Sequence, residues 1–226
     1  MSRLAAFVGV FLSFGNLSAF AAPDGDLAAI PQSAPAPRIE TRIEIGGDTP
    51  PPAANLFFIS MPAPRAEPGS DARPPSGYIA FCERNPRECQ APRNEPGRVR
   101  FTQEIWATLQ KVNLVVNGAI RPMDDIDHYA TKEYWTVPVD GGGDCEDYVL
   151  AKRKMLTLLG LPASALRITV ALNERRVRHA VLMVVTDRGD YVLDNAQDEI
   201  LSPDRVGYTW LERQDFSSRT GWIAMN

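Results

Sequence analysis

The segment Gly141–Gly160, GGGDCEDYVLAKRKMLTLLG, constrains the fold more than any other part of the chain. Its glycines lead directly into a helix-forming sequence, which places Cys145 on the first turn of the predicted helix. The unpaired N–H groups and the positive dipole end of a helix N-terminus favour a thiolate over a thiol. At about 100° per residue, Cys145 shares a face with a mostly apolar set, so we expect its sulfur to point inward; the set is Tyr148, Val149, Lys152, Met155, Leu156 and Leu159. Gly160 predicts a left-handed helix stop. A buried structural cysteine is the alternative to a reactive one.

Residues 1–22 have the pattern of a secretory signal peptide. Arg3 gives a positive start, Leu4–Leu12 an apolar run, and Ala19–Ala21 a small-x-small cleavage site. The alternative is a membrane anchor, but Ser13–Asn16 interrupts the run before the roughly 20 apolar residues that a spanning helix needs. We therefore predict export to the periplasm or the medium, with no transmembrane segment left after cleavage.

Residues 23–76 contain 12 of the 19 prolines in the chain, a composition that resists both helix and central strand. This range is predicted to be a proline-rich arm or linker, and residues 77–226 to be the folded domain. The formal net charge of −4 leaves no basic surplus, so the composition gives no indication of nucleic-acid binding.

The three cysteines differ in their spacing. Cys82 and Cys89 lie seven positions apart in FCERNPREC, and Cys145 stands alone. In an oxidising compartment the close pair predicts a small disulfide loop, which leaves one free thiol. A metal site at the pair is the weaker alternative, because the spacing is long and neither histidine lies nearby.

Periodicity predicts helices first and strands afterwards. Thr102 can cap a helix whose apolar residues repeat on one face from Ile105 to Val116. From Leu166 to Leu172 apolar residues alternate with others, which indicates a half-buried strand, and Val177–Val185 and Tyr191–Asp194 favour two more strands. The order predicts an α+β domain with helices packed on one side of an antiparallel sheet.

A cysteine nucleophile needs a base within hydrogen-bond reach and a third group that orients the base. His179 lies near the start of the second predicted strand, and Asp194 ends the third. A histidine that is merely part of the core is the alternative for His179 taken alone. The order of Cys145, His179 and Asp194 on helix, strand and strand favours a catalytic triad.

The hairpin between the last two strands decides whether Asp194 reaches His179. A two-residue loop at Arg188-Gly189 would place Asp194 four residues along the strand from His179, which is about 13 Å at roughly 3.3 Å per residue. A four-residue loop from Thr186 to Gly189 places Asp194 opposite Val181 and diagonal to His179, at about 7 to 8 Å between backbones, which side chains can bridge. We predict the four-residue loop, with a positive φ at Gly189.

His128 is the competing base. It lies in DDIDH, where neighbouring carboxylates favour its cationic form over a neutral base. A solvated surface loop is the stronger interpretation of this segment.

Three carboxylates, Asp144, Glu146 and Asp147, flank the thiol and oppose thiolate formation. In one interpretation their oxygens hold a hard cation such as calcium, which would offset their charge. In the other, Asp144 caps the helix and the other two complement its dipole. The spacing alone leaves both open.

Three motifs, GGGDCEDYVLAKRKMLTLLG, HAVLMVV and YVLDNAQDEI, resemble in this order the bacterial transglutaminase-like cysteine proteinases, which include the LapG-type periplasmic proteases. The approach to the cysteine, VNGAIRPMDDIDHYATKEYWTVPVDGGGDC, is also similar, so the resemblance covers about Val112 to Ile200. It implies a papain-like fold in the transglutaminase sense. The proline-rich arm and FCERNPREC lie outside the matched part.

The resemblance also implies roles. Cys145 would be the nucleophile, His179 the general base and then acid, and Asp194 the group that orients the imidazole. The backbone N–H of Cys145 would contribute to the oxyanion hole, for which Trp135 is a weak second donor, with packing as its alternative.

The family's calcium-binding carboxylates correspond to Asp144 and Glu146, with Asp147 as a third candidate, which favours calcium as a cofactor. LapG-type proteases cut a surface adhesin and are inhibited by an inner-membrane receptor. The resemblance therefore implies a protein substrate, such as an adhesin, and an inner-membrane regulatory receptor as partners. The leading hypothesis is an exported cysteine endopeptidase. An acyl transferase or amidase with the same triad, and a calcium-dependent binding protein on an inactive protease fold, are the alternatives.

Overall fold

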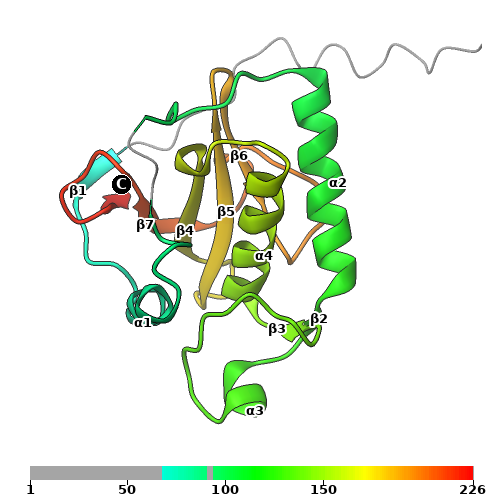
Figure 1. The fold of residues 1–226 in the computed structure, drawn as a ribbon, viewed down its shortest axis with the longest axis vertical. Helices are drawn as coiled ribbons and strands as arrows, with labels where there is room; N and C mark the ends of the chain where they lie inside the picture. Colours follow the sequence, from blue (N-terminus) through cyan, green and yellow to red (C-terminus); the bar gives the residue numbers. More distant parts are fainter. Residues whose placement is uncertain (1–67, 91–93, 226) are drawn as a thin grey trace, which may run out of the picture. The chain divides into compact units, whose positions relative to one another are not determined.

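The computed structural model describes residues 68–90 and 94–225 of the 226-residue chain (Figure 1). The predicted signal peptide, residues 1–22, and the predicted arm up to residue 67 lie outside the described residues. Within the described part, none of the helices is long and apolar enough to cross a membrane.

A six-stranded sheet forms the centre of the fold. Each strand pairs antiparallel with its neighbours. The order across the sheet is β1 (Pro68–Asp71), β8 (Trp222–Met225), β7 (Thr209–Gln214), β4 (Leu166–Leu172), β5 (Arg178–Thr186) and β6 (Gly189–Leu193). The two strands of the predicted site, β5 and β6, are therefore neighbours at one edge.

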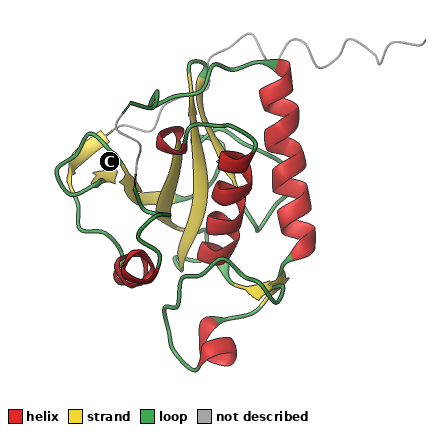
Figure 2. Cartoon of the chain, viewed as in Figure 1, coloured by secondary structure: helices red, strands yellow, loops and turns green. Residues whose placement is uncertain are grey.

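Two long helices cover this edge of the sheet. α4 (Cys145–Leu158) packs on β5, and α2 (Gln103–Ala119) packs on α4 (Figure 2). The shorter elements are α1 (Ser76–Arg84), β2 (Arg121–Pro122), α3 (Asp125–Tyr129), β3 (Gly142–Gly143) and the single 3-10 turn η2 (Ala163–Ala165). This arrangement confirms the predicted α+β fold with helices on an antiparallel sheet.

The helix caps follow the sequence signals. Thr102 Oγ1 accepts a hydrogen bond from the Ile105 N–H at 3.2 Å and so caps α2. Gly160, at φ 92°, ends α4 in the left-handed region. Met155 and Leu159, predicted on the inward face of α4, are 37% and 59% exposed, whereas Leu156 on the same turn as Met155 is fully buried.

The strand β4 differs from its prediction. The alternating pattern indicates one buried face, yet Thr169 and Ala171 are as buried as the apolar residues between which they lie. β4 lies between β5 and β7, and a second apolar cluster covers the sheet face away from α4. This cluster contains Val181, Met183, Val192 and Val206. Both faces of β4 are therefore covered.

The sheet also includes strands outside the predicted set. β1 lies within the range 23–76 that was predicted to be an arm, and it pairs with β8. The ring of Tyr78 in α1 packs edge to face on the ring of Trp222 in β8, at 5.3 Å between centroids. Cys82 and Cys89 form the disulfide that their spacing predicts, joining the end of α1 to the turn that follows it.

Candidate active site

The glycine run has a steric reason. Gly141 has φ 77°, a conformation that favours glycine. A Cβ on Gly143 would lie 2.7 Å from Asp147 Oδ2, which leaves no room for any other residue. These two positions allow the chain to turn tightly from β3 into α4, and Cys145 is the first residue of that helix.

His179 and Asp194 meet at the end of the β5–β6 hairpin. His179 Nε2–H donates to Asp194 Oδ1 at 2.7 Å, and the two side chains are 11% and 0% exposed. Asp194 also accepts from the Ala196 N–H at 3.0 Å and from the Tyr208 hydroxyl at 2.7 Å. Burial alone would raise the pKa of Asp194, but these bonds, above all that from His179, lower it below its ordinary value.

The predicted register is confirmed, and the predicted loop length is wrong. Leu182 pairs with Leu193, which places Asp194 opposite Val181 and diagonal to His179. The strands continue as far as the Thr186–Gly189 pair, so the loop is only Asp187-Arg188. Thr186 Oγ1 accepts a hydrogen bond from the Arg188 N–H and donates one to the Gly189 carbonyl. The turn therefore lies one residue earlier than the Arg188-Gly189 loop that was the alternative. Gly189 has the expected positive φ, 119°.

Cys145 and His179 line the same pocket, which has a volume of about 320 Å³. The Cys145 sulfur lies beside the backbone N–H of Ala180, the residue after His179. Because Asp194 binds Nε2, the imidazole nitrogen left for the thiol is Nδ1. The rest of the lining is polar and charged: Pro122, Met123, Asp124, Lys132, Glu133, Gly143, Asp144, Glu146, Arg178 and Asn195.

The Cys145 thiol makes a hydrogen bond to the residue that follows it. Cys145 S–H donates to Glu146 Oε2 at 3.1 Å. Burial, and then the Glu146 carboxylate, raises the pKa of Cys145 well above its ordinary value, while the Ala180 N–H opposes the rise. The carboxylates therefore do oppose thiolate formation, as the sequence predicts.

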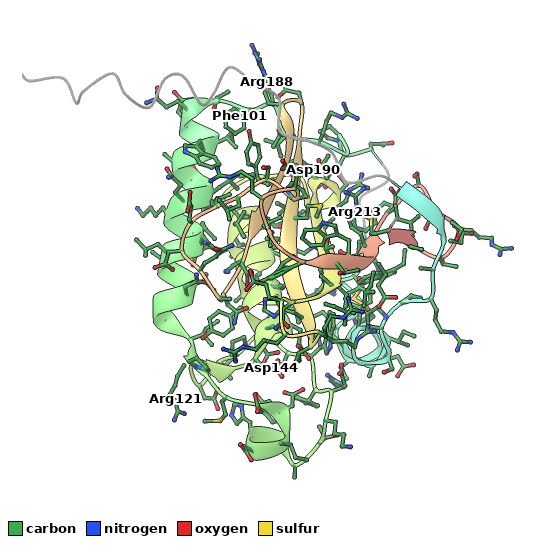
Figure 3. The ribbon with its side chains drawn as sticks, turned by 180° about the vertical axis from the view of Figure 1, so that it is seen from behind. Phe101, Arg121, Asp144, Arg188, Asp190 and Arg213 are labelled. Carbon is green, nitrogen blue, oxygen red and sulfur yellow. A yellow bond between two sulfur atoms is a disulfide. The ribbon has the colours of Figure 1, made fainter. Side chains whose placement is uncertain are left out.

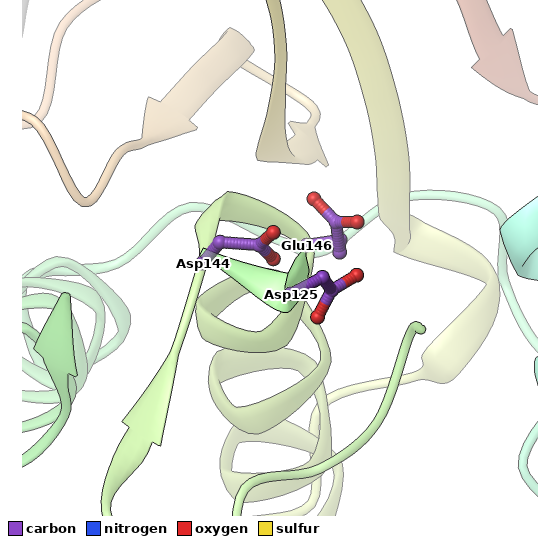
Figure 4. Close-up of side chains that lie close together, drawn as sticks. All are labelled: Asp125, Asp144 and Glu146. Carbon is purple, nitrogen blue, oxygen red and sulfur yellow. The ribbon is translucent and has the colours of Figure 1, made fainter. Parts of the chain in front are cut away.

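Three carboxylates gather next to the thiol: those of Asp125, Asp144 and Glu146 (Figure 4). One oxygen from each lies within 4.8 Å of the others. Asp125 Oδ1 and Asp144 Oδ1 are buried and have no hydrogen-bond partner within the described ranges. Burial and then Glu146 and Asp125 raise the pKa of Asp144 to about 8. Convergent, unsatisfied carboxylate oxygens are the ligands that calcium prefers, so the group fits a hard cation.

Asp125, rather than Asp147, is the third member of this cluster. Asp147 Oδ1 accepts from the Thr136 N–H at 2.8 Å, and the side chain is fully buried under the glycine run. The side chain of Asp144 occupies the N-cap position of α4 without making a capping hydrogen bond. The arrangement thus favours the cation interpretation of Asp144 over helix capping.

His128 and Trp135 have other contacts. His128 Nε2 lies 2.7 Å from Asp140 Oδ2, and its ring stacks on Tyr129 at 3.9 Å between centroids. Trp135 is 3% exposed, and its Nε1–H donates to Glu133. These contacts agree with the packing alternative for Trp135.

Sequence reasoning missed two residues of the site, Tyr208 and Asp125. Tyr208 donates to Asp194 and packs its ring edge to face with His179 at 5.6 Å between centroids. Asp125 belongs to the same DDIDH motif as His128, so its acidity was visible. Its position beside Asp144 depends on the fold of the segment between α2 and β3, which has no periodicity to read.

The cysteine at the start of α4 lines the same pocket as a hydrogen-bonded pair of a histidine on β5 and an aspartate directly after β6, an arrangement that resembles the site of papain-like cysteine peptidases. The chain belongs to the family of bacterial transglutaminase-like cysteine proteinases, whose model matches residues 68–226. This family is one of cysteine peptidases.

Solved structures of LapG from Legionella pneumophila are similar to the chain. One has 29% sequence identity over 49% of this chain and 64% of that chain, with a TM-score of 0.44. A calcium-bound form has 27% identity over 54% of this chain and 68% of that chain, with a TM-score of 0.46. The chain thus spans less than two thirds of the first of these proteins. No curated protein sequence matches the chain significantly.

Proposed function

We propose that the chain is an exported cysteine endopeptidase that acts through Cys145, His179 and Asp194. The observation that carries this proposal is the 2.7 Å contact between His179 Nε2 and Asp194 Oδ1, in the same pocket as the only cysteine outside the disulfide. An imidazole oriented in this way presents its second nitrogen to a thiol at the start of α4. Family membership supports the same chemistry.

In the proposed reaction, His179 Nδ1 takes the proton of Cys145 and the sulfur attacks the scissile carbonyl carbon. The backbone N–H of Cys145, at the N-terminus of α4, stabilises the oxyanion that forms. His179 then gives its proton to the leaving amine, and water releases the acid product from the thioester. Asp194 holds the imidazole orientation and stabilises its cationic form throughout.

Thiol labelling tests the nucleophile and base without a known substrate. We expect iodoacetamide to modify Cys145 faster than a free thiol at neutral pH, because His179 accepts its proton. His179→Ala is expected to slow the reaction by about 10² to 10⁴-fold, whereas the matched variant His128→Ala should react like the wild type. The modified residue is identified by mass spectrometry, with Cys145→Ala as the blank.

A wild-type thiol no more reactive than a free cysteine would contradict the enzyme proposal and favour a binding protein on an inactive fold. Incubation with candidate exported polypeptides, followed by sequencing of new N-termini, separates hydrolysis from acyl transfer. New N-termini that depend on Cys145 support an endopeptidase.

We further propose that Asp125, Asp144 and Glu146 bind calcium, with Asp147 supporting the turn beneath them. A bound cation would offset the negative charge beside the thiol. It would also satisfy the buried oxygens of Asp125 and Asp144 that have no partner in the described structure. Glu146, whose carboxylate accepts a hydrogen bond from the Cys145 thiol here, would then be attracted to the cation more strongly than to the thiol.

Calcium is expected to raise the midpoint of thermal unfolding, and more so at higher pH. Without a cation, the folded protein holds the Asp144 proton up to a pKa of about 8, while the unfolded chain loses it near its ordinary value. Stability therefore falls as the pH rises from about 4 to about 8, and a cation that replaces the proton removes this fall. Differential scanning fluorimetry with calcium or with chelator, at about pH 5 and about pH 8, measures the effect.

Asp144→Asn and Asp125→Asn should each weaken the calcium response, while Asp127→Asn, at an exposed position of the same short helix as Asp125, should keep it. Equal midpoints with calcium and with chelator in the wild type would remove the metal proposal and leave the triad untouched.

The substrate proposed for this site is an exported or cell-surface polypeptide, and the site of action is the periplasm or the cell exterior. The signal-peptide pattern of residues 1–22 and the Cys82–Cys89 disulfide support this location. An adhesin substrate and an inner-membrane regulatory receptor, which the family resemblance implies, belong to the same proposal.

A further inference from the structure

Tyr208 contacts both His179 and Asp194 from a third segment of chain, the connection that leads into β7. Its hydroxyl donates to Asp194 Oδ2 at 2.7 Å. Its ring packs edge to face with the imidazole of His179 at 5.6 Å between centroids, and lies 6.1 Å from the ring of Trp210. One side chain is therefore placed to act on the orientation of the whole pair.

The two oxygens of Asp194 have different donors. Oδ1 accepts from His179 Nε2–H at 2.7 Å and from the Ala196 N–H at 3.0 Å. Among the residues that the structure describes, only the Tyr208 hydroxyl donates to Oδ2. Because the Asp194 side chain is 0% exposed, solvent does not reach Oδ2 to replace this donor. Without the hydroxyl, Oδ2 would be a buried carboxylate oxygen with no partner.

The bond to Oδ2 has a consequence for the imidazole. A carboxylate that is bonded at one oxygen can turn about its bond to Cβ, whereas bonds at both oxygens fix its plane. The position of Oδ1 sets the direction of the bond from His179 Nε2–H, and so the position of Nδ1, the nitrogen left for Cys145. Burial, and then the bond to Asp194, raise the pKa of Tyr208 above its ordinary value, so the hydroxyl remains a donor at neutral pH.

Packing alone accounts for the ring of Tyr208 but not for its hydroxyl. The ring packs against the apolar cluster on the sheet face away from α4. A phenylalanine at this position would make the same ring contacts. The hydroxyl, which is directed at the carboxylate, therefore needs a separate explanation.

We propose that Tyr208 is a positioning residue of the active site: its hydroxyl fixes the plane of the Asp194 carboxylate, and thereby the orientation and the tautomer of the His179 imidazole. In this arrangement the proton of the neutral imidazole lies on Nε2, and the hydroxyl keeps it there. The inference deepens the proposed function of the triad, on which its meaning for catalysis rests.

The test removes the hydroxyl and keeps the ring, with Tyr208→Phe. Tyr208 also lines a second pocket, of about 430 Å³, so an alanine at this position would open Asp194 to that pocket and confuse the result. Tyr191→Phe is the matched control, because Tyr191 lies on β6 and its hydroxyl makes no hydrogen bond within the described ranges.

The tautomer is measured first, by heteronuclear NMR of the imidazole nitrogens. Both variants are made in the Cys145→Ala protein, in which no thiol interacts with His179, and spectra are recorded at about pH 8, where an imidazole is neutral. The chain has two histidines, so His128→Ala assigns the signals. We expect one tautomer, with the proton on Nε2, in Cys145→Ala and with Tyr191→Phe added, and a mixture of both tautomers with Tyr208→Phe added.

The same changes are then compared with Cys145 intact, by alkylation with iodoacetamide at neutral pH and saturating calcium. Tyr208→Phe is expected to lower the rate by about 10- to 100-fold, and Tyr191→Phe to leave it unchanged. An unchanged tautomer or an unchanged rate in Tyr208→Phe would overturn the inference. A loss of folding in this variant, read from its thermal unfolding, would also overturn it, since the hydroxyl would then serve stability.

Failure of the proposed function is recognised separately. The wild-type thiol would then show no enhanced reactivity, while the tautomer of His179 in the Cys145→Ala protein would still respond to the Tyr208 hydroxyl.

Discussion

Replacing Asp194 with alanine is expected to slow the alkylation of Cys145 at neutral pH by about 10² to 10⁴-fold. The carboxylate accepts three hydrogen bonds, from His179, Ala196 and Tyr208, and the side chain is fully buried. Without it the imidazole loses the partner that fixes its orientation, and the Tyr208 hydroxyl is left without its acceptor. The iodoacetamide rate, read by mass spectrometry of the Cys145 peptide, measures the loss.

Asp204→Ala is the matched control, because Asp204 is an exposed aspartate later in the same connection and its bond is to Ser202. Its alkylation rate should equal that of the wild type. If Asp194→Ala stayed within tenfold of the wild type while correctly folded, Asp194 would not be the residue that orients His179.

A second large effect is expected on stability, at the ion pair of Arg213 and Asp190 on the sheet face away from α4 (Figure 3). Arg213 Nη1 donates to Asp190 Oδ2 at 3.0 Å, and the side chains are 6% and 3% exposed. Asp190→Ala removes the main counter-charge of a buried guanidinium, which Arg167 repels and Asp215 attracts more weakly. We expect a loss of about 3 to 5 kcal/mol in the free energy of unfolding, measured by urea denaturation.

The pair of Arg178 and Glu212, with side chains 58% and 18% exposed, gives the comparison, since Glu212 precedes Arg213 on the same strand. Glu212→Ala should cost less than about 1 kcal/mol. The double replacement Asp190→Leu with Arg213→Met, which removes both charges, should recover most of the stability lost in Asp190→Ala. A loss in Asp190→Ala no larger than in Glu212→Ala would mean that the buried pair contributes little.

The part of the site that follows local rules could be predicted from the sequence. The glycine run before an apolar helix places Cys145, because few other sequences turn so sharply into a helix. The requirement that Asp194 reach His179 selects, between the two registers that the alternation allows, the one that the structure has. Thr186 was assigned to the loop, whereas it pairs with Gly189 at the end of the strand and its hydroxyl bonds across the turn.

The parts that depend on chain segments far apart in sequence could not be predicted. Asp125 reaches the thiol region only because α3 folds back over the start of α4, and Tyr208 reaches Asp194 from a loop without regular structure.

One wall of the pocket and one carboxylate of the proposed cation site belong to the same stretch of chain. This wall of the pocket is formed by Pro122, Met123, Asp124, Lys132 and Glu133, and Asp125 lies in the same stretch. A cation that fixes Asp125 against α4 would fix this wall as well, so the two binding events would share a free energy of coupling. Such coupling is reciprocal: a peptide bound in the pocket would raise the affinity for calcium by the same factor by which calcium raises the affinity for the peptide. A calcium titration would then report occupancy of the cleft, even by a peptide that is never cut.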